Sequence, residues 1–204
     1  MNFDDLITLR LPPPNRIGKQ EGEYEHHFYE GAVMVAYAMH LLTNEESNEV
    51  LIHPDGEHGK QFDFANWLAG RGFAKVSETG RTAYAGTYVD SAGRTIIIHP
   101  KSGLGDVVAR VGGTTVMAEC KGGVLNTRHP GQRSRLNKGL CEMVGRLMAS
   151  QSPGRQIAVA PFTIETHRLA RRLAPRCKLA GIELALVTSD GKVLAINPNL
   201  TEQH

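Results

Sequence analysis

The 204-residue sequence contains few cysteines and no long hydrophobic segment. Cys120, Cys141 and Cys177 are widely spaced and include no CxxC pair, which argues against a disulfide-stapled fold and against a structural zinc site. The longest apolar stretch, residues 31–42, contains His40 and is too short to span a bilayer. We therefore expect a protein of a reducing compartment that does not enter the membrane.

Signals for secretion and for several common enzyme classes are also missing. The first ten residues, MNFDDLITLR, carry acids where a secretory signal would carry bases. There is no GxSxG elbow and no P-loop, so nothing indicates a serine hydrolase or an NTPase. With 41% apolar residues, the chain can bury a core without disulfides. These features predict a globular, cytoplasmic protein.

The formal net charge of +2 conceals an uneven distribution of charge. The first hundred residues hold 8 Lys and Arg against 14 Asp and Glu, whereas the remainder holds 15 against 7. A basic half joined to an acidic half is typical of proteins with a polyanionic partner. The alternative is an ordinary surface with unevenly scattered charges.

The apolar pattern predicts an α/β chain in which helices and strands alternate. Residues 1–22, with three consecutive prolines, are expected to form an irregular arm, and Pro175 is expected to end or kink the last helix. The helices are predicted at 23–43, 59–70, 133–149 and 166–174, and the strands at 73–76, 84–89, 94–98, 104–111, 114–121, 156–161 and 183–188.

The most informative segment is the predicted hairpin around Gly112-Gly113. Both central positions of a type I′ turn need positive φ, which favours a two-residue turn at this glycine pair. Val111 would then face Thr114, and Asp106 would face Glu119 on one side of the sheet. Directly opposed Cβ atoms lie about 4.5–5.5 Å apart, so the two carboxylates would repel each other.

Three arrangements could offset this repulsion between Asp106 and Glu119. One carboxyl could stay protonated, Lys121 on the same face could compensate the charge, or a divalent cation could bind between the acids. Oxygen ligands favour Mg²⁺ or Mn²⁺, and such an ion beside an ammonium suits phosphodiester hydrolysis. The alternative is an exposed ion pair between Lys121 and one of the acids, which would have no catalytic role.

Gly105-Asp106, followed after twelve residues by Glu119-Cys120-Lys121, resembles the PD-(D/E)XK signature of the restriction-endonuclease-like superfamily. The flanking elements, over residues 59–196, are similar to the α-β-β-β-α-β core of that family, a central mixed sheet flanked by helices. Residues 160–163 and 181–184 are similar to the branch with Mrr-type restriction enzymes and Holliday-junction resolvases. The sequence departs from the family at Gly105, where the signature has proline.

The resemblance implies a role for each residue of the motif. Asp106 and Glu119 would be the metal ligands, with the Cys120 carbonyl as a third, and Lys121 would be the catalytic lysine. The metal would be Mg²⁺, with Mn²⁺ as a substitute.

The family often carries a further acid or glutamine on the first core helix, which the spacing assigns to Gln61, with Glu57 and Asp63 as competitors. Gln132 is a looser match to a helix-borne glutamine of some members. The resemblance also implies a division into an N-terminal arm and helical extension, 1–57, and a nuclease-like core, 58–204. The helix at 23–43 would then lie outside the core, as a packing layer or a dimer surface.

A basic cluster follows the lysine motif. In a nuclease these side chains would contact DNA phosphates, and otherwise they form a solvated helix face. We expect DNA, duplex or branched, as the partner, and a homodimer is attractive because paired nicks need two active sites. The cluster consists of Arg128, Arg133, Arg135 and Lys138.

The sequence thus predicts a Mg²⁺-dependent endodeoxyribonuclease that hydrolyses phosphodiester bonds. The alternative is a catalytically inactive protein of the same fold that acts as a nucleic-acid-binding or assembly module. The active nuclease is favoured because the sequence retains all three residues of the motif, Asp106, Glu119 and Lys121.

Overall fold

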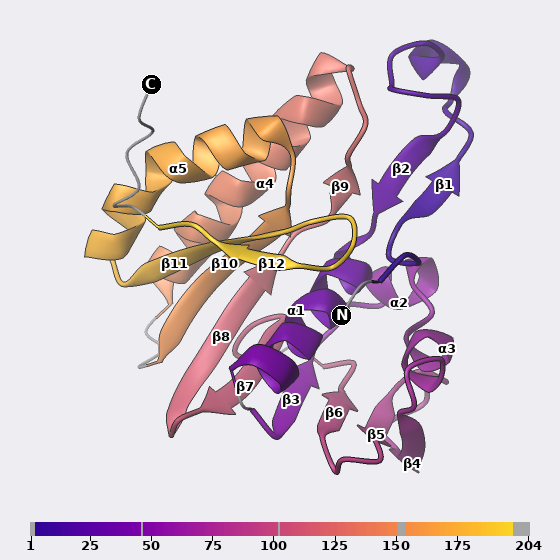
Figure 1. The fold of residues 1–204 in the computed structure, drawn as a ribbon, viewed down its shortest axis with the longest axis vertical. Helices are drawn as coiled ribbons and strands as arrows, with labels where there is room; N and C mark the ends of the chain where they lie inside the picture. The colour runs from indigo at the N-terminus through magenta and orange to yellow at the C-terminus, as the bar shows by residue number, and fades with distance from the viewer. Residues whose placement is uncertain (1–2, 46, 102, 151–153, 198–204) are drawn as a thin grey trace.

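The computed structural model describes residues 3–45, 47–101, 103–150 and 154–197. Over these residues the chain forms a nine-stranded mixed sheet with the order β12-β11-β10-β8-β7-β3-β6-β5-β4 (Figure 1). Its strands are β3 (Glu49–Ile52), β4 (Ala74–Glu78), β5 (Gly86–Val89), β6 (Thr95–Ile98), β7 (Val107–Val111), β8 (Thr114–Cys120), β10 (Arg155–Pro161), β11 (Ile182–Val187) and β12 (Val193–Ala195).

A second, three-stranded sheet and the helices complete the described part of the chain. The small sheet has the order β1-β2-β9, and a short 3-10 helix, Pro14–Arg16, lies between its first two strands. The expected α/β class with a mixed sheet flanked by helices is confirmed. The remaining elements are β1 (Thr8–Arg10), β2 (Glu25–Phe28), β9 (Gly123–Val124), α1 (Glu30–Asn44), α2 (His58–Gln61), α3 (Phe64–Ala69), α4 (Pro130–Ala149) and α5 (Ile164–Leu179).

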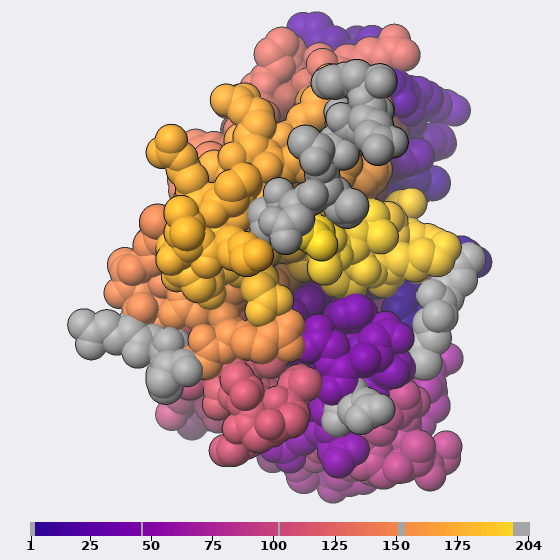
Figure 2. All heavy atoms as spheres, turned by 60° about the vertical axis from the view of Figure 1, so that its left-hand side comes forward, coloured from indigo at the N-terminus to yellow at the C-terminus, as the bar shows by residue number. Residues whose placement is uncertain are grey.

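The large sheet separates two hydrophobic cores. Helix α1 packs on one face with residues such as Val50, Val107 and Cys120. Helices α4 and α5 cover the other face, against Met117 and Leu184 among others. In the space-filling view, the β11–β12 segment lies between α5 and α1 (Figure 2). None of the helices in these ranges is both long and apolar enough to cross a bilayer.

The helix predicted at 23–43 is corrected in both its start and its place. Residues Glu25–Phe28 form a strand that pairs with β1 and β9, and the helix begins only at Glu30. From Gly31 to Met39 every residue of α1 is buried. A helix that is apolar on all sides belongs in a core, so α1 is not a peripheral extension.

The expected boundary at residue 57 also does not divide the packing. The strand β3, which is absent from the strands predicted above, pairs with β7 on one side and β6 on the other, inside the large sheet. Its pairing with β6 is parallel and with β7 antiparallel. Residues on both sides of position 57 therefore build one sheet.

The helix predicted at 59–70 is two short helices, α2 and α3. Phe62 has extended backbone angles, and its side chain is buried against the core. The side chain of Asp63 then accepts a hydrogen bond from the Asn66 N–H and caps α3. In α5, by contrast, the helix continues past Pro175 to Leu179, because Ala174 and Cys177 on either side of the proline are buried.

The predicted hairpin register is confirmed. Val111 pairs with Thr114 and Val107 with Ala118, and both turn glycines, Gly112 and Gly113, have positive φ. The same alternation places Asp106 and Glu119 on the face that carries α4, at the open end of the hairpin.

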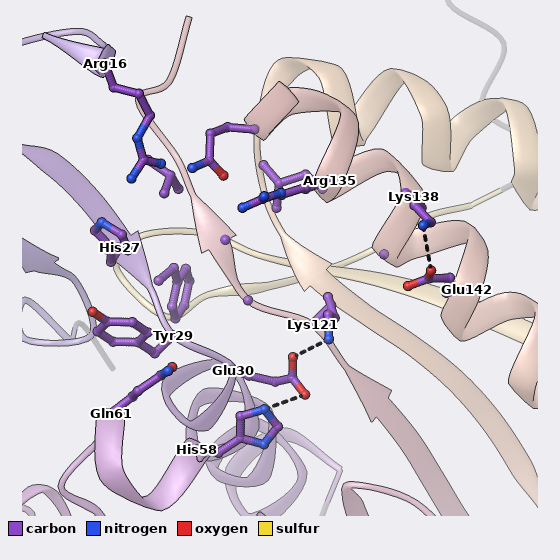
Figure 3. A pocket seen from close by; sticks show the side chains of 17 residues that line it. Arg16, His27, Tyr29, Glu30, His58, Gln61, Lys121, Arg135, Lys138 and Glu142 are labelled. Carbon is purple, nitrogen blue, oxygen red and sulfur yellow. Dashed lines mark ion pairs between the residues drawn. The ribbon is translucent and has the colours of Figure 1, made fainter. Parts of the chain in front are cut away.

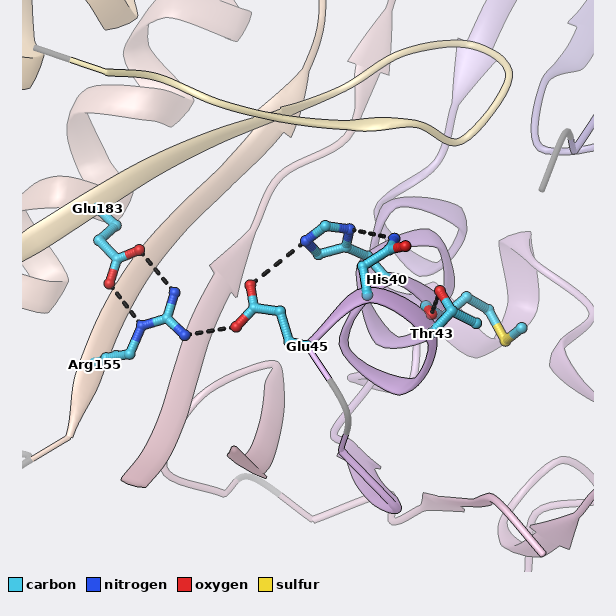
Figure 4. Close-up of polar contacts among 7 residues, drawn as sticks. His40, Thr43, Glu45, Arg155 and Glu183 are labelled. Carbon is cyan, nitrogen blue, oxygen red and sulfur yellow. Dashed lines mark hydrogen bonds and ion pairs between the residues drawn. The ribbon is translucent and has the colours of Figure 1, made fainter. Parts of the chain in front are cut away.

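An ion-pair cluster ties the C-terminus of α1 to the sheet (Figure 4). Arg155, at the start of β10, donates two hydrogen bonds to Glu183 at 2.8 and 2.9 Å. It also donates to Glu45, the residue that follows α1, and His40 lies 3.5 Å from the same carboxylate. A guanidinium suits this position because the C-terminus of a helix carries partial negative charge.

Candidate active site

The carboxyl group of Asp106 is fixed where β7 begins. Its Oδ2 accepts a hydrogen bond from the Cys120 N–H at 2.7 Å, and its carbonyl accepts from the His53 N–H at 2.8 Å. Glu119 lies beside it on β8, and both side chains line one cleft of about 430 Å³. We call this the carboxylate cleft, lined by Glu30, His53, Asp55, His58, Asp106, Glu119, Lys121 and Arg146 together with neighbouring Pro and Gly residues.

The ammonium of Lys121 enters this cleft beside a third acid. Its Nζ lies 3.0 Å from Oε2 of Glu30, and His58 Nε2 lies 3.1 Å from Oε1 of the same carboxylate (Figure 3). Asp55 Oδ1 lies 3.2 Å from the other imidazole nitrogen. Lys121 can run along α4 because residue 139 is glycine, where a Cβ would lie 2.8 Å from the lysine Cγ.

A single arginine approaches the acids from α4. Arg146 lies 3.5 Å from Oε2 of Glu119. The arginine side chain is 72% exposed, whereas that of Glu119 is 15% exposed. An ion pair so open to solvent contributes little, about 0–1 kcal/mol, so the buried carboxylate is only partly compensated.

The pKa values of the two acids show this lack of compensation. Burial raises the pKa of Asp106 to about 7, although the hydrogen bond from the Cys120 N–H opposes the change. The negative charges of Glu119 and Glu30 raise it further. Burial also raises the pKa of Glu119, against the opposing charge of Arg146. The cleft therefore favours either a bound proton or a bound cation.

The donor set fits a hard divalent cation. Asp106 and Glu119 offer carboxylate oxygens, which Mg²⁺ and Mn²⁺ prefer. Two positive charges between them would remove the penalty that raises both pKa values. No group of three or more His, Cys, Asp or Glu side chains arranged to hold a metal is present in the described ranges. With two protein carboxylates, the remaining ligands would come from water and a substrate phosphate, as is usual for Mg²⁺.

The residues assigned to the first core helix do not join the carboxylate cleft. Gln61 lines a neighbouring cavity, and so does Gln132. Glu57 pairs with Lys60 at the surface, and Asp63 caps α3. The acid beside Lys121 in the cleft is Glu30, at the start of α1, and no residue of the 59–70 segment lines the cleft.

Cys120 and Gly105 support the motif through the backbone. The Cys120 side chain is buried on the opposite face of the sheet from Glu119, and burial raises its pKa. The role of its carbonyl as a metal ligand stays a prediction. A Cβ at Gly105 would lie 2.7 Å from Met117 Cγ and 2.9 Å from the Ala118 carbonyl oxygen, so β8 packs too closely here for a side chain.

The basic cluster divides into two pairs. Arg135 and Lys138 line the neighbouring cavity. Arg128 lies 3.8 Å from Glu21, and Arg133 lies 3.6 Å from Glu165, and neither lines either cavity. The structure thus brings half of this cluster to the cavity beside the carboxylate cleft, and none of its four members lines the cleft itself.

Three residues that line the cleft were not predicted from the sequence: Glu30, His58 and Arg146. For Glu30 a signal exists: it is the last charged residue before a run of apolar residues that reaches His40. A helix buried on all sides must lie against the sheet, so the polar residue at its start is a strong candidate for function. Arg146 and His58 have no comparable signal, because their contacts depend on how helices pack.

Comparisons of this chain with protein-family models, with curated proteins and with solved structures find no match. Function must therefore be inferred from the cleft itself. It combines buried acids that favour a cation with an ammonium held by a third acid. Such a site can bind a divalent ion and stabilise negative charge that develops on a bound substrate.

Proposed function

We propose that this protein is a Mg²⁺-dependent endonuclease that hydrolyses DNA phosphodiester bonds, with a restriction-endonuclease-like core. The observation that carries the proposal is the buried pair Asp106 and Glu119 with raised pKa values beside Lys121. The resemblance of these residues to the PD-(D/E)XK signature supports the same conclusion.

Each group of the cleft would have a defined task. Asp106 and Glu119 would hold the cation, which when bound polarises the scissile phosphate and lowers the pKa of a water molecule. Lys121 would orient the attacking water and stabilise the extra charge of the pentavalent transition state. Glu30 and His58 position that ammonium, because Glu30 contacts both side chains.

The test is cleavage of supercoiled plasmid DNA with Mg²⁺ or Mn²⁺. Nicking or linearisation is expected, and it should stop when EDTA is added. Glu119→Ala and Lys121→Ala should abolish it, whereas Glu78→Gln, at an exposed acid on β4, should cleave like the wild type. Circular dichroism should show that the inactive variants are folded.

Two results would contradict the mechanism. Cleavage that survives Glu119→Ala would exclude this cleft as the active site. A wild type that binds DNA in a salt-sensitive way but binds neither Mg²⁺ nor Mn²⁺ would favour the alternative, an inactive nucleic-acid-binding or assembly module.

A further inference from the structure

A second cavity, of about 530 Å³, adjoins the carboxylate cleft. The two share Glu30, His58 and Lys121 as a common wall. Four cations and two acids, Glu30 and Glu142, line the second cavity. Besides Lys121, the cations are Arg16 from the N-terminal arm and Arg135 and Lys138 from α4 (Figure 3). We call it the cationic cavity. Its position predicts that whatever occupies it lies directly beside a substrate at Lys121.

Arg16 is held in place by a buried acid. Its Nε lies 3.1 Å from Oε1 of Glu25, whose side chain is 2% exposed. The second oxygen of Glu25 contacts His27 Nε2 at 3.0 Å. Burial lowers the pKa of His27 and so disfavours a second cation beside Glu25, which leaves Arg16 as the main ion-pair partner of that carboxylate. The guanidinium is thus oriented toward the cavity before any ligand arrives (Figure 3).

The arm that carries Arg16 is anchored to the segment that leads into α4. The Glu21 N–H donates to the Asn126 carbonyl at 2.7 Å, and the Arg128 N–H donates to the Lys19 carbonyl at 2.7 Å. Gln20 and Thr127 form a β-bridge between the two segments. The arm is therefore a fixed wall of the cavity rather than an irregular tail.

Arg135 reaches the cavity from the opposite wall. Its side chain is exposed, and within the described residues it forms no ion pair. Lys138, by contrast, lies 3.6 Å from Glu142. Two guanidinium groups, one held by a buried acid and one without a counter-ion, suit bidentate contacts to a phosphate oxygen pair.

We propose that the cationic cavity binds the phosphate adjacent to the scissile one in the nucleic-acid strand, through Arg16 and Arg135. This inference rests on the proposed function for the identity of the scissile phosphate. It assigns the N-terminal arm to the substrate-binding surface, which the motif alone does not include. The Tyr29 ring already contacts the Arg10 guanidinium, 5.1 Å from its centroid, and the His27 ring, with centroids 5.5 Å apart, so the proposal assigns recognition of the backbone and not of a base.

The test measures binding without hydrolysis. A fluorescein-labelled DNA duplex and a single strand of the same sequence are titrated by anisotropy in EDTA at several salt concentrations. Arg135→Gln and Arg16→Gln should each weaken binding about tenfold, as expected for loss of a charged hydrogen bond. Each should also reduce the slope of log affinity against log salt by about 0.9 for a duplex. Arg110→Gln, on the exposed far part of β7, is the matched control and should change neither quantity.

Arg16→Gln leaves Glu25 without its cation, so its melting temperature must be measured as well. If that variant is unstable, Arg135→Gln still tests the proposal, because the Arg135 side chain is exposed and forms no ion pair with any residue that the structure describes. Wild-type affinity and salt slope in Arg135→Gln would overturn the proposal. Wild-type protein that does not bind either DNA would overturn it too.

DNA affinity and cleavage kinetics, measured on the same variants, separate phosphate binding in the cationic cavity from nuclease activity in the carboxylate cleft. If both arginine variants lose affinity but the wild type never cleaves DNA with Mg²⁺, phosphate binding by the cationic cavity is supported and the nuclease proposal is contradicted. If the wild type cleaves and Arg135→Gln keeps its KM, the cavity proposal fails alone. In the expected result, Arg135→Gln raises KM and leaves kcat nearly unchanged.

Discussion

The carboxylate cleft and the cationic cavity share a wall yet have opposite electrostatic character. In the cleft, Glu30, Asp106 and Glu119 gather negative charge, and burial raises the pKa values of the last two. In the cavity, Arg16 and Arg135 gather positive charge around an apolar floor that includes buried Leu136. One region favours a cation and the other an anion, which is the complementarity that the proposed substrate, a phosphodiester strand with a metal ion at one phosphate, would require.

The largest effect is expected for Asp106→Asn, which should lower the rate of DNA cleavage without lowering the affinity for DNA. Asp106→Asn would remove one proposed ligand of the cation, whose contribution of several kcal/mol to transition-state stabilisation corresponds to a loss of about 10³-fold in cleavage rate. Binding of DNA in EDTA should be equal or tighter, because a negative charge near the phosphate path has been removed. Plasmid cleavage and anisotropy measure the two quantities. A parallel loss of both would show that the two regions do not act separately.

The second prediction concerns pH and the stability of the metal-free protein. Asp106 has a pKa of about 7 in the folded chain and 3.8 as its ordinary value. The folded state therefore binds the proton more tightly, and the stability that it contributes is present below pH 4 and is lost as the pH rises to about 7. Asp106→Asn should be more stable than wild type at pH 8, with a difference about 2–4 kcal/mol larger than at pH 4.

Urea unfolding in EDTA at both pH values measures this difference. Adding Mg²⁺ at pH 8 should recover stability in the wild type but not in Asp106→Asn. A difference between the proteins that is independent of pH would mean that the carboxyl is not buried as described. Glu119→Gln should show the same sign, since burial raises the pKa of Glu119 also.

The third prediction concerns Glu30, in the common wall between the carboxylate cleft and the cationic cavity. Glu30→Gln removes the charge that holds both Lys121 and His58, and loss of a supporting contact typically lowers activity about 10- to 100-fold. Because Glu30 is proposed to position Lys121, the loss should fall on kcat, and DNA affinity in EDTA should be equal or tighter, since a negative charge in the wall common to both cavities is removed. Steady-state cleavage kinetics with Glu78→Gln as control measure it. An affinity that falls with kcat would place Glu30 in the binding surface instead.

The smallest effect is expected at Arg146. This side chain is 72% exposed and lies 3.5 Å from Glu119, so its ion pair is worth about 0–1 kcal/mol. Arg146→Gln should free Glu119 for the cation and lower the Mg²⁺ concentration needed for half-maximal cleavage by up to about fivefold. A higher requirement for Mg²⁺ would show that Arg146 assists the site and does not compete with the cation.

The sequence predicts the hairpin of this fold well because its signals are local. The glycine pair at 112–113 sets the turn, and the two-residue period of a strand then determines which side chains face each other. Asp106 and Glu119 follow directly, because they are placed by counting residues from the turn.

The rest of the site depends on packing between distant segments. The strands β2, β3 and β9 have only two to four residues each, too few for a clear apolar alternation. Glu30 reaches the cleft only because β2 ends at Phe28 and α1 packs on the sheet. Arg16 enters the cavity only through its contact with Glu25. None of these placements is encoded by spacing within one segment.

The burial of α1 has a consequence for how activity is lost. Glu30 is in the first turn of the helix that fills one core of the sheet, and the other end of that helix is fixed by Arg155 through Glu45. The side chain that positions Lys121 therefore cannot move without disrupting the core. On heating, the proposed nuclease activity and the tertiary structure should disappear in one cooperative transition, without a prior stage in which the fold is intact but the cleft is disordered.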